Sequence, residues 1–320
     1  MVPVSRNNCS DEICMDEAII KELHLKKFVP IGSKLHGGCI SKARAYHTDK
    51  YGDVFIKFNN DPKAREMFDG EFASLDEISQ TNTIHVPKPI KSIYDDGRAC
   101  LVTEYISMTG PAKPEQLGTQ LARLHLHNIE KVYASDESCS FVGATRKNPP
   151  PIRQFGFHIT TYSGYMPLIN EWSENWVEFF CRYRLKSVID VIAEKYGDRQ
   201  VLSLWPMLER KIPNYFVGCQ IVPSLLHGDL WSGNYSYDDN GPVVFDPASF
   251  YGHSEFEMGI LTMFGGFDDA FFTAYHKLIP KTSGFDKRIF LYQLFHHLNH
   301  WNHFGDSYRM GALTLMQLLS

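Results

Sequence analysis

The spacing of hydrophobic residues divides the chain into a first third rich in strands and a remainder rich in helices. Apolar residues at intervals of three and four predict helices at 15–25 and 64–78. Short runs of β-branched and aromatic residues predict strands or extended segments at 28–31, 43–48, 54–58, 86–94 and 99–106. This order predicts a small lobe, in which the helix at 64–78 lies beside a mainly antiparallel sheet.

The pattern changes after Ile106, where Gly110, Pro111 and Pro114 indicate a linker. Beyond the linker, helical spacing predominates, and a segment rich in Ser, Asn and Pro predicts a surface loop at 135–152. The predicted helices are 116–126, 172–196, 200–211 and most of 255–319. We therefore expect an α+β protein with two domains, residues 1–106 and a mainly helical domain of residues 107–320.

Composition narrows the range of partners. The net charge of −5 gives no electrostatic case for a nucleic acid or an anionic membrane. No apolar run reaches the roughly 18 residues that a membrane span needs. The acidic first thirty residues lack the features of a targeting signal, and the seven cysteines are scattered without a C-x-x-C pair. We expect a cytoplasmic protein with reduced thiols.

A group of polar residues follows two apolar segments near residue 230. Asp229 lies five residues before Asn234, and Asp246 ends the apolar run of Val243 to Phe245. Phosphoryl transfer from ATP needs one carboxylate for the accepting hydroxyl, and an amide and a second carboxylate for magnesium. Protein kinases have the same layout in H-R-D-x-x-x-x-N and D-F-G. Here Gly228 replaces the Arg and Pro-Ala replaces Phe-Gly, which favours a small-molecule kinase.

This layout predicts a role for each polar residue. Asp229 is the candidate catalytic residue, which accepts the proton of the substrate hydroxyl or orients that hydroxyl. Asn234 and Asp246 offer the hard oxygen ligands that Mg²⁺ prefers. His227 is expected to brace the loop by hydrogen bonds. The alternative is a turn in which Gly, Asp and Asn serve the backbone only.

Lys57 ends the strand Val-Phe-Ile-Lys, which resembles the kinase strand whose Lys contacts the α- and β-phosphates. The alternative is a solvated strand lysine. Glu66, Glu71 and Glu77 on the following helix are candidate partners. We favour Glu71, because it lies next to the inward apolar face of that helix.

Two further segments are candidates for binding ATP. Gly37, Gly38 and Cys39 form a turn between two strands, where backbone N–H groups can face phosphates. The alternative is an ordinary tight turn. Cys39 in this turn is also a candidate redox-sensitive thiol, because surrounding N–H dipoles can acidify it. Kinase-like folds hold adenine at the hinge, which predicts adenine contacts at 104–106: Glu104, Tyr105 and Ile106.

Aromatic and imidazole side chains supply the candidate acceptor site. Trp231 lies inside the catalytic segment, and indole faces pack well on the C–H faces of sugars. His296, His300 and His303 recur at helical spacing, so one face presents three imidazoles. A substrate-lining face is favoured over a zinc site, because no Cys or H-E-x-x-H pattern accompanies them. The candidate substrate residues are Trp231, His300 and Trp301.

The chain resembles the fructosamine-3-kinase/ketosamine-3-kinase family over nearly its whole length from about residue 25. The segments that carry this resemblance are 37–41, 63–71, 155–158, 226–234, 246–255 and 292–305. The resemblance implies a two-lobed protein-kinase-like fold, related to aminoglycoside and choline kinases, with ATP and Mg²⁺ as cofactors. By motif position, Asp229 corresponds to the family's catalytic aspartate, Asn234 and Asp246 to its metal ligands, and Lys57 with Glu71 to its phosphate-positioning pair.

The resemblance also implies a substrate class. The acceptor is the 3-hydroxyl of a ketosamine (ribulosamine, psicosamine or fructosamine) on a small amine or a glycated protein. Phosphorylation destabilises the adduct and regenerates the amine, which amounts to protein deglycation and repair. A monomer, or a redox-dependent dimer linked through Cys39, is implied. Two alternatives are another small-molecule kinase of this fold and a non-catalytic nucleotide-binding module.

Overall fold

The computed structural model describes residues 8–37, 41–138 and 150–320. The chain divides into two compact units: an N-terminal unit of residues 1–76 and 87–107, and a C-terminal unit of residues 77–86 and 108–320. The predicted domain boundary after residue 106 lies one residue from the second of these divisions. The segment 77–86, expected in the first domain, groups instead with the C-terminal unit.

A five-stranded antiparallel sheet forms the centre of the N-terminal unit, with the strand order β1-β2-β3-β5-β4. The turn between β4 and β5 has positive φ values at Asp96 and Gly97, two residue types that tolerate this conformation. The antiparallel sheet predicted from the spacing of apolar residues is therefore confirmed. The strands are β1 (Phe28–Gly37), β2 (Ser41–Thr48), β3 (Gly52–Asn59), β4 (Pro89–Asp95) and β5 (Arg98–Glu104).

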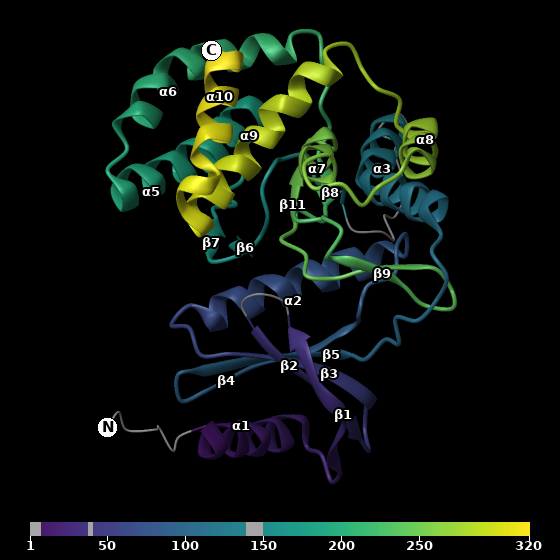
Figure 1. The fold of residues 1–320 in the computed structure, drawn as a ribbon. Helices are drawn as coiled ribbons and strands as arrows, with labels where there is room; N and C mark the ends of the chain where they lie inside the picture. The colour runs from purple at the N-terminus through teal and green to yellow at the C-terminus, as the bar shows by residue number, and fades with distance from the viewer. Residues whose placement is uncertain (1–7, 38–40, 139–149) are drawn as a thin grey trace. The chain divides into compact units, whose positions relative to one another are not determined.

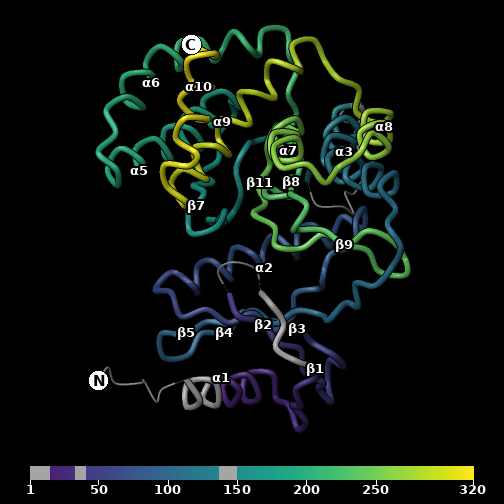
Figure 2. Tube along the Cα trace, in the orientation of Figure 1, coloured from purple at the N-terminus to yellow at the C-terminus, as the bar shows by residue number. Residues whose placement is uncertain are grey.

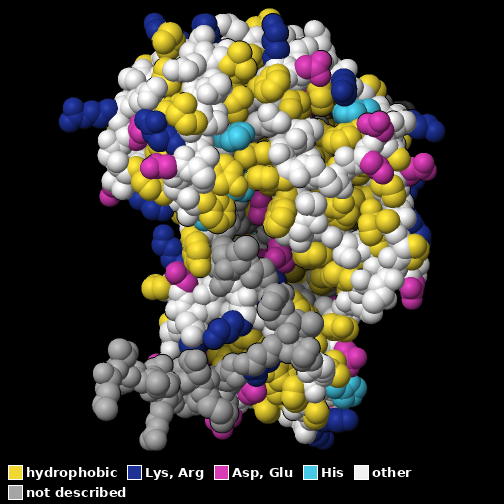
Figure 3. Space-filling model, viewed as in Figure 1, with side chains coloured by type: hydrophobic (Ala, Val, Ile, Leu, Met, Phe, Trp, Pro, Cys, Tyr) yellow, Lys and Arg dark blue, Asp and Glu magenta, His cyan; other side chains and the backbone are white. Residues whose placement is uncertain are grey.

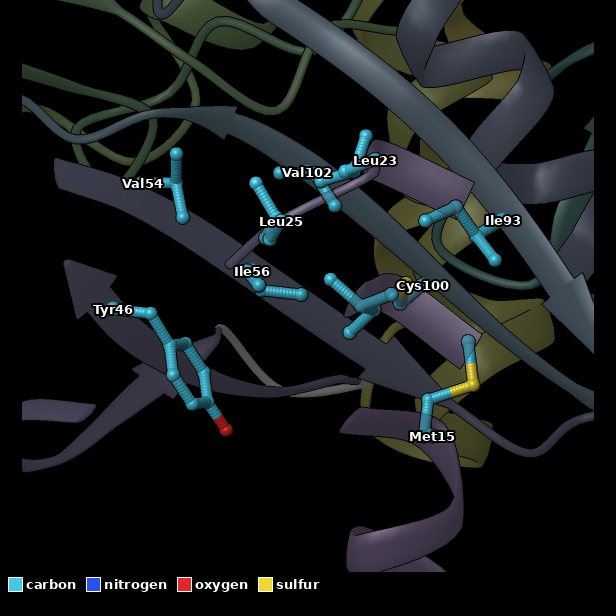
Figure 4. Close-up of a cluster of buried hydrophobic side chains, with 10 residues drawn as sticks. Met15, Leu23, Leu25, Tyr46, Val54, Ile56, Ile93, Cys100 and Val102 are labelled. Carbon is cyan, nitrogen blue, oxygen red and sulfur yellow. The ribbon is translucent and has the colours of Figure 1, made fainter. Parts of the chain in front are cut away.

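Helix α1 (Asn8–Leu23) packs on one face of this sheet and closes its hydrophobic core. Figure 4 shows side chains from the helix and from the strands meeting in that core. Its buried members include Met15, Ile19, Leu23, Leu25, Tyr46, Val54, Ile56, Ile93, Cys100 and Val102. The sequence predicted a helix at 15–25, and the observed helix begins earlier and ends two residues sooner. The unit therefore has two helices, where the predicted fold class placed one beside the sheet.

Helix α2 (Ala64–Thr81) lies across the other face of the sheet from α1 (Figure 1). Successive side chains of a strand point to opposite faces. Because Val54 and Ile56 of β3 point into the α1 core, Lys57 points toward α2. The strand register thus delivers one ammonium group to the helix that carries the candidate carboxylates.

The C-terminal unit is mainly helical, as predicted. The predicted helix at 172–196 is interrupted by a π-helical turn, η1 (Cys181–Lys186). Helix α3 continues to Ser138, four residues into the segment predicted as a loop, and residues 139–149 lie outside the described residues. The helices are α3 (Pro114–Ser138), α4 (Trp176–Phe180), α5 (Ser187–Tyr196), α6 (Arg199–Lys211), α7 (Glu255–Leu261), α8 (Asp269–Leu278), α9 (Phe285–Phe304) and α10 (Arg309–Leu319), with short 3-10 turns η2 (Ile212–Phe216) and η3 (Gly305–Ser307).

Three short antiparallel strand pairs complete this unit: β6 (Thr161–Ser163) with β7 (Met166–Leu168), β9 (Tyr235–Tyr237) with β10 (Pro242–Val244), and β8 (Ser224–Leu226) with β11 (Phe250–Gly252). The pairing of Leu226 with Phe250 places the start of the Asp229 segment beside the end of the Asp246 segment. An aromatic core centred on Trp176 supports this pair, since its ring stacks on Phe250 and its Nε1–H donates to Tyr292.

The surface charge and the hydrophobicity of the helices bear on the partners that the composition predicts. On the face drawn in Figure 3, acidic and basic side chains of the C-terminal unit are interspersed and form no continuous basic area. Within the described part of the chain, no helix combines the length and the hydrophobicity needed to cross a membrane.

Acid will destabilise the fold through two buried histidines of the C-terminal unit. Burial lowers the pKa of His253 to about 4 and that of His296 well below its ordinary value. Unfolding exposes the rings, whose pKa then returns to about 6.5, so their neutral forms stabilise the fold above pH 6.5. This stabilisation is lost as the pH falls through 6.5 toward 4. For His253 the full loss is about 3 kcal/mol.

Urea unfolding between pH 7 and pH 4.5 measures this effect. We expect the free energy of unfolding to fall less steeply with acid in His253→Gln than in the unmodified protein. His158→Gln, a substitution at an exposed position, is the matched control and should leave the slope unchanged. Equal slopes in all three proteins would exclude His253 as a source of acid sensitivity.

Candidate active site

The Asp229 segment leaves β8 through Gly228, whose φ of 86° is in the left-handed region. A Cβ atom at this position would lie 2.1 Å from the backbone oxygen of Ala248. The N–H of Ala248 in turn donates to the carbonyl of His227 at 2.8 Å. Glycine is therefore required here, because the two candidate catalytic segments touch through their backbones.

His227 braces the segment through both ring nitrogens. Its Nδ1 accepts the N–H of Asp229 at 3.3 Å, so Nε2 carries the proton and donates to the carbonyl of Phe245 at 2.9 Å. Complete burial lowers the pKa of the imidazole and favours this neutral form. The geometry agrees with the bracing role predicted for His227.

Asp229, Asn234 and Asp246 come together as their spacing predicted. The side-chain amide N–H of Asn234 donates to the carbonyl of Asp229 at 2.8 Å, and the backbone carbonyl of Asn234 accepts the N–H of Phe245 at 3.0 Å. Burial and the neighbouring carboxylates of Asp246 and Glu257 raise the pKa of Asp229 to about 7. The negative charges of Asp229 and Asp246 therefore lie close enough to repel each other.

The backbone of Asp246 is strained. Its φ of 58° is one of four positive values at non-glycine residues in the described chain. Such conformations cost about 1 kcal/mol or more and cluster at functional sites. An amide oxygen and carboxylate oxygens, gathered where like charges repel, suit a hard divalent cation such as Mg²⁺. These residues therefore fit the metal that the motif predicts.

Glu257 is a member of the site that the sequence did not reveal. Its two oxygens accept the N–H groups of His227 at 2.7 Å and of Gly228 at 3.0 Å. Burial alone would raise its pKa, but the hydrogen bonds and the histidines His125 and His227 lower it. Glu257 is thus a charged, fully buried carboxylate that holds the backbone of the two residues directly before Asp229. A glutamate inside the otherwise apolar run of residues 256–261 is the signal that could have indicated it.

The predicted Lys57–Glu71 pair is present in the N-terminal unit. The Nζ of Lys57 lies 2.6 Å from Oε1 of Glu71, and both side chains are largely buried. Of the other two candidates, Glu66 is exposed, and Glu77 accepts a hydrogen bond from the hydroxyl of Tyr251 at 2.7 Å. The choice of Glu71 from the apolar face of α2 is therefore confirmed.

The structure describes only some of the other residues that were predicted to contact ATP. Gly37 ends β1 and pairs with Ser41, while Gly38 and Cys39 lie outside the described residues. The N–H of Glu104 donates to Lys88, and the N–H of Tyr105 donates to the carbonyl of Asp53 at 3.1 Å. These two N–H groups are used by hydrogen bonds within the N-terminal unit. Adenine contacts at Glu104, Tyr105 and Ile106 remain predictions.

Trp231 is partly exposed beside Asp229, as a substrate platform requires. A Cβ atom at Gly233 would lie 2.3 Å from its ring, so the indole covers this glycine. A residue with a side chain at position 233 would collide with the indole of Trp231, so the loop conformation requires glycine there. The exposed fraction of Trp231 is 39%, which leaves part of the residue accessible to a ligand.

The three histidines of α9 do not form a metal site. Nδ1–H of His303 donates to the carbonyl of Asn299, and its Nε2 accepts the N–H of Tyr165 at 2.8 Å. His296 is buried among rings such as Phe256. Among the described residues, no group of three or more His, Cys, Asp or Glu side chains could hold a metal. The zinc alternative therefore has no support.

His300 and Trp301 point in different directions. His300 is partly exposed, and its Nδ1–H donates to the carbonyl of His296 at 2.7 Å, which leaves Nε2 as an acceptor. Burial lowers the pKa of His300 and favours this neutral form. Trp301 is fully buried and stacks on Tyr196, so the prediction that it contacts substrate is wrong. Because α9 is apolar on several sides, the sequence did not show which of its aromatic residues is exposed.

Comparison with known proteins gives the family. The family model described as "Fructosamine kinase" matches residues 15–320. The chain belongs to the fructosamine kinase family. It is 50% identical over 288 residues to a ketosamine-3-kinase of Mus musculus, an alignment that covers 89% of this chain and 93% of the relative. It is 36% identical to a chloroplastic protein-ribulosamine 3-kinase of Arabidopsis thaliana, over 94% of this chain and 85% of that protein.

Solved structures confirm the fold of this fructosamine kinase family member. A candidate fructosamine-3-kinase of Haemophilus somnus has a TM-score of 0.75 at 21% identity, covering 95% of this chain and 96% of that one. Amicoumacin kinase, solved with AMP-PNP and Ca²⁺, has a TM-score of 0.51 at 14% identity, covering 97% and 95%. The chain therefore has the predicted α+β, protein-kinase-like fold. Its family membership makes it an enzyme, a kinase with a hydroxyl acceptor.

Proposed function

We propose that this kinase transfers the γ-phosphoryl group of ATP, with Mg²⁺, to the 3-hydroxyl of ketosamines. The acceptors are ribulosamine, psicosamine or fructosamine units on small amines or on glycated proteins. The observation that carries the proposal is the geometry of Asp229, Asn234 and Asp246 in a chain 50% identical to a ketosamine-3-kinase. Phosphorylation would destabilise the adduct and return the free amine, a form of protein deglycation.

Each residue has a distinct role in this proposal. The carboxylate of Asp229 orients the sugar hydroxyl and takes its proton, and its raised pKa makes it a better base than an ordinary carboxylate. Asn234 and Asp246 would hold Mg²⁺, which neutralises charge on the phosphates. Glu71 orients the ammonium of Lys57, which contacts the α- and β-phosphates. Backbone N–H groups of Gly37, Gly38 and Cys39 are the groups proposed to cover the phosphates.

Trp231 and His300 are the proposed sugar contacts. The accessible part of Trp231 suits the C–H face of a sugar, and Nε2 of His300 can accept a hydrogen bond from a hydroxyl. The segment between α7 and α8 contacts the surroundings of both residues. The ring centroid of Phe264 lies 4.9 Å from that of His300, and Gly266 lies against Ser232, the residue after Trp231. A neutral site of this kind recognises sugar chemistry without requiring a charged acceptor. A cytoplasmic location and a Cys39-linked dimer under oxidation remain predictions.

A panel of acceptors tests the proposal. The protein is incubated with Mg-ATP and, in parallel, with ribulosamine, psicosamine and fructosamine derivatives of one amine, the unglycated amine, a free ketose, choline and an aminoglycoside. We expect phosphate transfer to the ketosamines only, with ³¹P NMR locating the phosphate at the 3-hydroxyl. Transfer to choline or the aminoglycoside would favour another small-molecule kinase. A thermal shift with Mg-ATP but no transfer to any acceptor would favour a non-catalytic binding module.

A further inference from the structure

A chain of buried polar groups reaches the catalytic loop from two helices far apart in the sequence. The hydroxyl of Tyr275 on α8 lies 2.7 Å from Nδ1 of His125 on α3, and Nε2 of His125 lies 3.6 Å from Oε2 of Glu257 on α7. Helices α3 and α8 run side by side (Figure 2) and pack closely, since a Cβ atom at Gly118 would lie 2.2 Å from the carbonyl oxygen of Phe271. All three side chains are almost completely buried.

The chemistry of the groups fixes the direction of the chain. An ionised carboxylate can only accept, so the Nε2 of His125, which faces Glu257 at 3.6 Å, carries a proton. Its Nδ1 then accepts the O–H of Tyr275, whose pKa burial raises well above the ordinary value, so that the hydroxyl stays protonated. Tyr275 therefore donates to His125, and the Nε2 of His125 faces Glu257 in an electrostatic contact that is longer than a hydrogen bond. Glu257 ends the chain by accepting the N–H groups of His227 and Gly228.

Burying three polar groups is costly unless each has a partner, and the phosphoryl-transfer roles described above use neither His125 nor Tyr275. Their chain ends two residues before Asp229, whose backbone is also held by His227 and Asn234. The segment that leads into α8 contacts the same loop, where the hydroxyl of Tyr235 donates to the carbonyl of Gly266 at 2.5 Å. The α8 region therefore contacts the catalytic segment in two places. Tyr275 of the helix reaches it through His125 and Glu257, and Gly266, which precedes the helix, bonds Tyr235.

We propose that His125 and Tyr275 are positioning residues, which orient Glu257 and thereby hold the Asp229 loop in the geometry for phosphoryl transfer. This inference rests on the proposed function, in which Asp229 acts on the acceptor hydroxyl. Displacement of a reacting group by a fraction of an ångström lowers the rate of the chemical step more than it weakens ground-state binding. The loss of the Tyr275 hydroxyl is therefore expected in kcat, and the KM values should change little.

The chain offers a matched control in Tyr292. Its hydroxyl lies 2.7 Å from Nδ1 of another buried histidine, His253, and its side chain is as buried as that of Tyr275. Its hydroxyl also accepts a hydrogen bond from Nε1–H of Trp176 at 3.0 Å, so these contacts lie in the aromatic core rather than on the catalytic loop. Tyr275→Phe and Tyr292→Phe thus remove the same atom from the same kind of bond.

The experiment compares kcat, both KM values and the free energy of unfolding for the two variants. We expect Tyr275→Phe to lower kcat roughly tenfold, with each KM within about twofold. Tyr292→Phe should lose a similar amount of stability and keep kcat within about twofold. Equal loss of kcat in both variants, or unchanged kcat in Tyr275→Phe, would overturn the positioning role.

Two more variants keep the outcome decisive. His125→Gln can still donate to Glu257 and should retain more kcat than His125→Leu, which cannot. Equal loss in both would count against the proposal.

Asp229→Asn separates the two hypotheses. If it stays active, the role proposed for Asp229 fails whatever Tyr275 does, while the ketosamine kinase activity itself is tested separately by the acceptor panel. If it is inactive while Tyr275→Phe behaves like Tyr292→Phe, only the positioning inference fails.

Discussion

Replacing Asp229 by Asn is expected to abolish nearly all phosphoryl transfer while leaving the fold intact. The amide has the shape of the carboxylate, but it cannot take the proton of the acceptor hydroxyl. General-base contributions of this kind amount to roughly 10²- to 10⁴-fold in rate, so we expect kcat to fall by about three orders of magnitude. Binding of Mg-ATP should persist, because Asn234 and Asp246 remain.

The stability of Asp229→Asn gives a second, independent readout. The pKa of Asp229 is raised to about 7 by burial and by the charges of Asp246 and Glu257. For an acid whose pKa is raised on folding, ionisation destabilises the native state once the pH exceeds the unfolded value near 4. Removing this charge should therefore keep or raise the melting temperature at pH 8. Lost activity with equal or higher stability is typical of a functional rather than a structural residue.

A matched control for this substitution is Asp198→Asn. Asp198 caps α6 by accepting the N–H groups of Gln200 and Val201, and it pairs with Arg309 at 2.7 Å. The same change there should lower the melting temperature and leave kcat unaltered. Steady-state kinetics with the best ketosamine acceptor, together with thermal unfolding, compares the two variants. An Asp229→Asn protein with kcat within tenfold of the unmodified enzyme would remove Asp229 from the mechanism.

Local patterns in the sequence were sufficient to place Lys57 and Glu71. Strand alternation sets the face of Lys57, and the apolar face of α2 selects Glu71 among three glutamates. The spacing of Asp229 and Asn234 was informative for the same reason, since five residues of one loop can be joined by one hydrogen bond. Short-range geometry is encoded in the order of residues, and the kinase motifs identified which of these short segments carry the chemistry.

The contacts that Glu257 and Tyr275 make with residues far away in the sequence could not be predicted from such local patterns. Glu257 contacts a backbone 30 residues earlier, and Tyr275 contacts a histidine 150 residues earlier. No periodicity relates such positions, because packing of helices decides which buried polar groups meet. Trp301 was misplaced for a related reason: its helix is largely buried, so apolar residues on several sides left the exposed face undetermined.

Replacing Asp246 by Asn is expected to weaken the binding of Mg-ATP. Asp246 supplies a charged oxygen next to Asn234, and Mg²⁺ prefers carboxylate ligands. Asparagine keeps the shape of the side chain and tolerates the φ of 58°, so the backbone need not move. We expect the concentration of Mg²⁺ needed for half-maximal activity to rise at least about tenfold. The affinity for metal-free ATP should stay the same or increase slightly, because a negative charge near the phosphates is lost.

The matched control is Asp96→Asn, which makes the same change at another aspartate with positive φ. Asp96 has a φ of 44° in the exposed turn between β4 and β5. Nucleotide affinity is measured by calorimetry across a magnesium titration for both variants and the unmodified protein. If Asp246→Asn binds ATP with unchanged affinity at every magnesium concentration, Asp246 is not a metal ligand. In that case the strain at its backbone would need another cause, such as the close contact of the two loop backbones at Gly228 and Ala248.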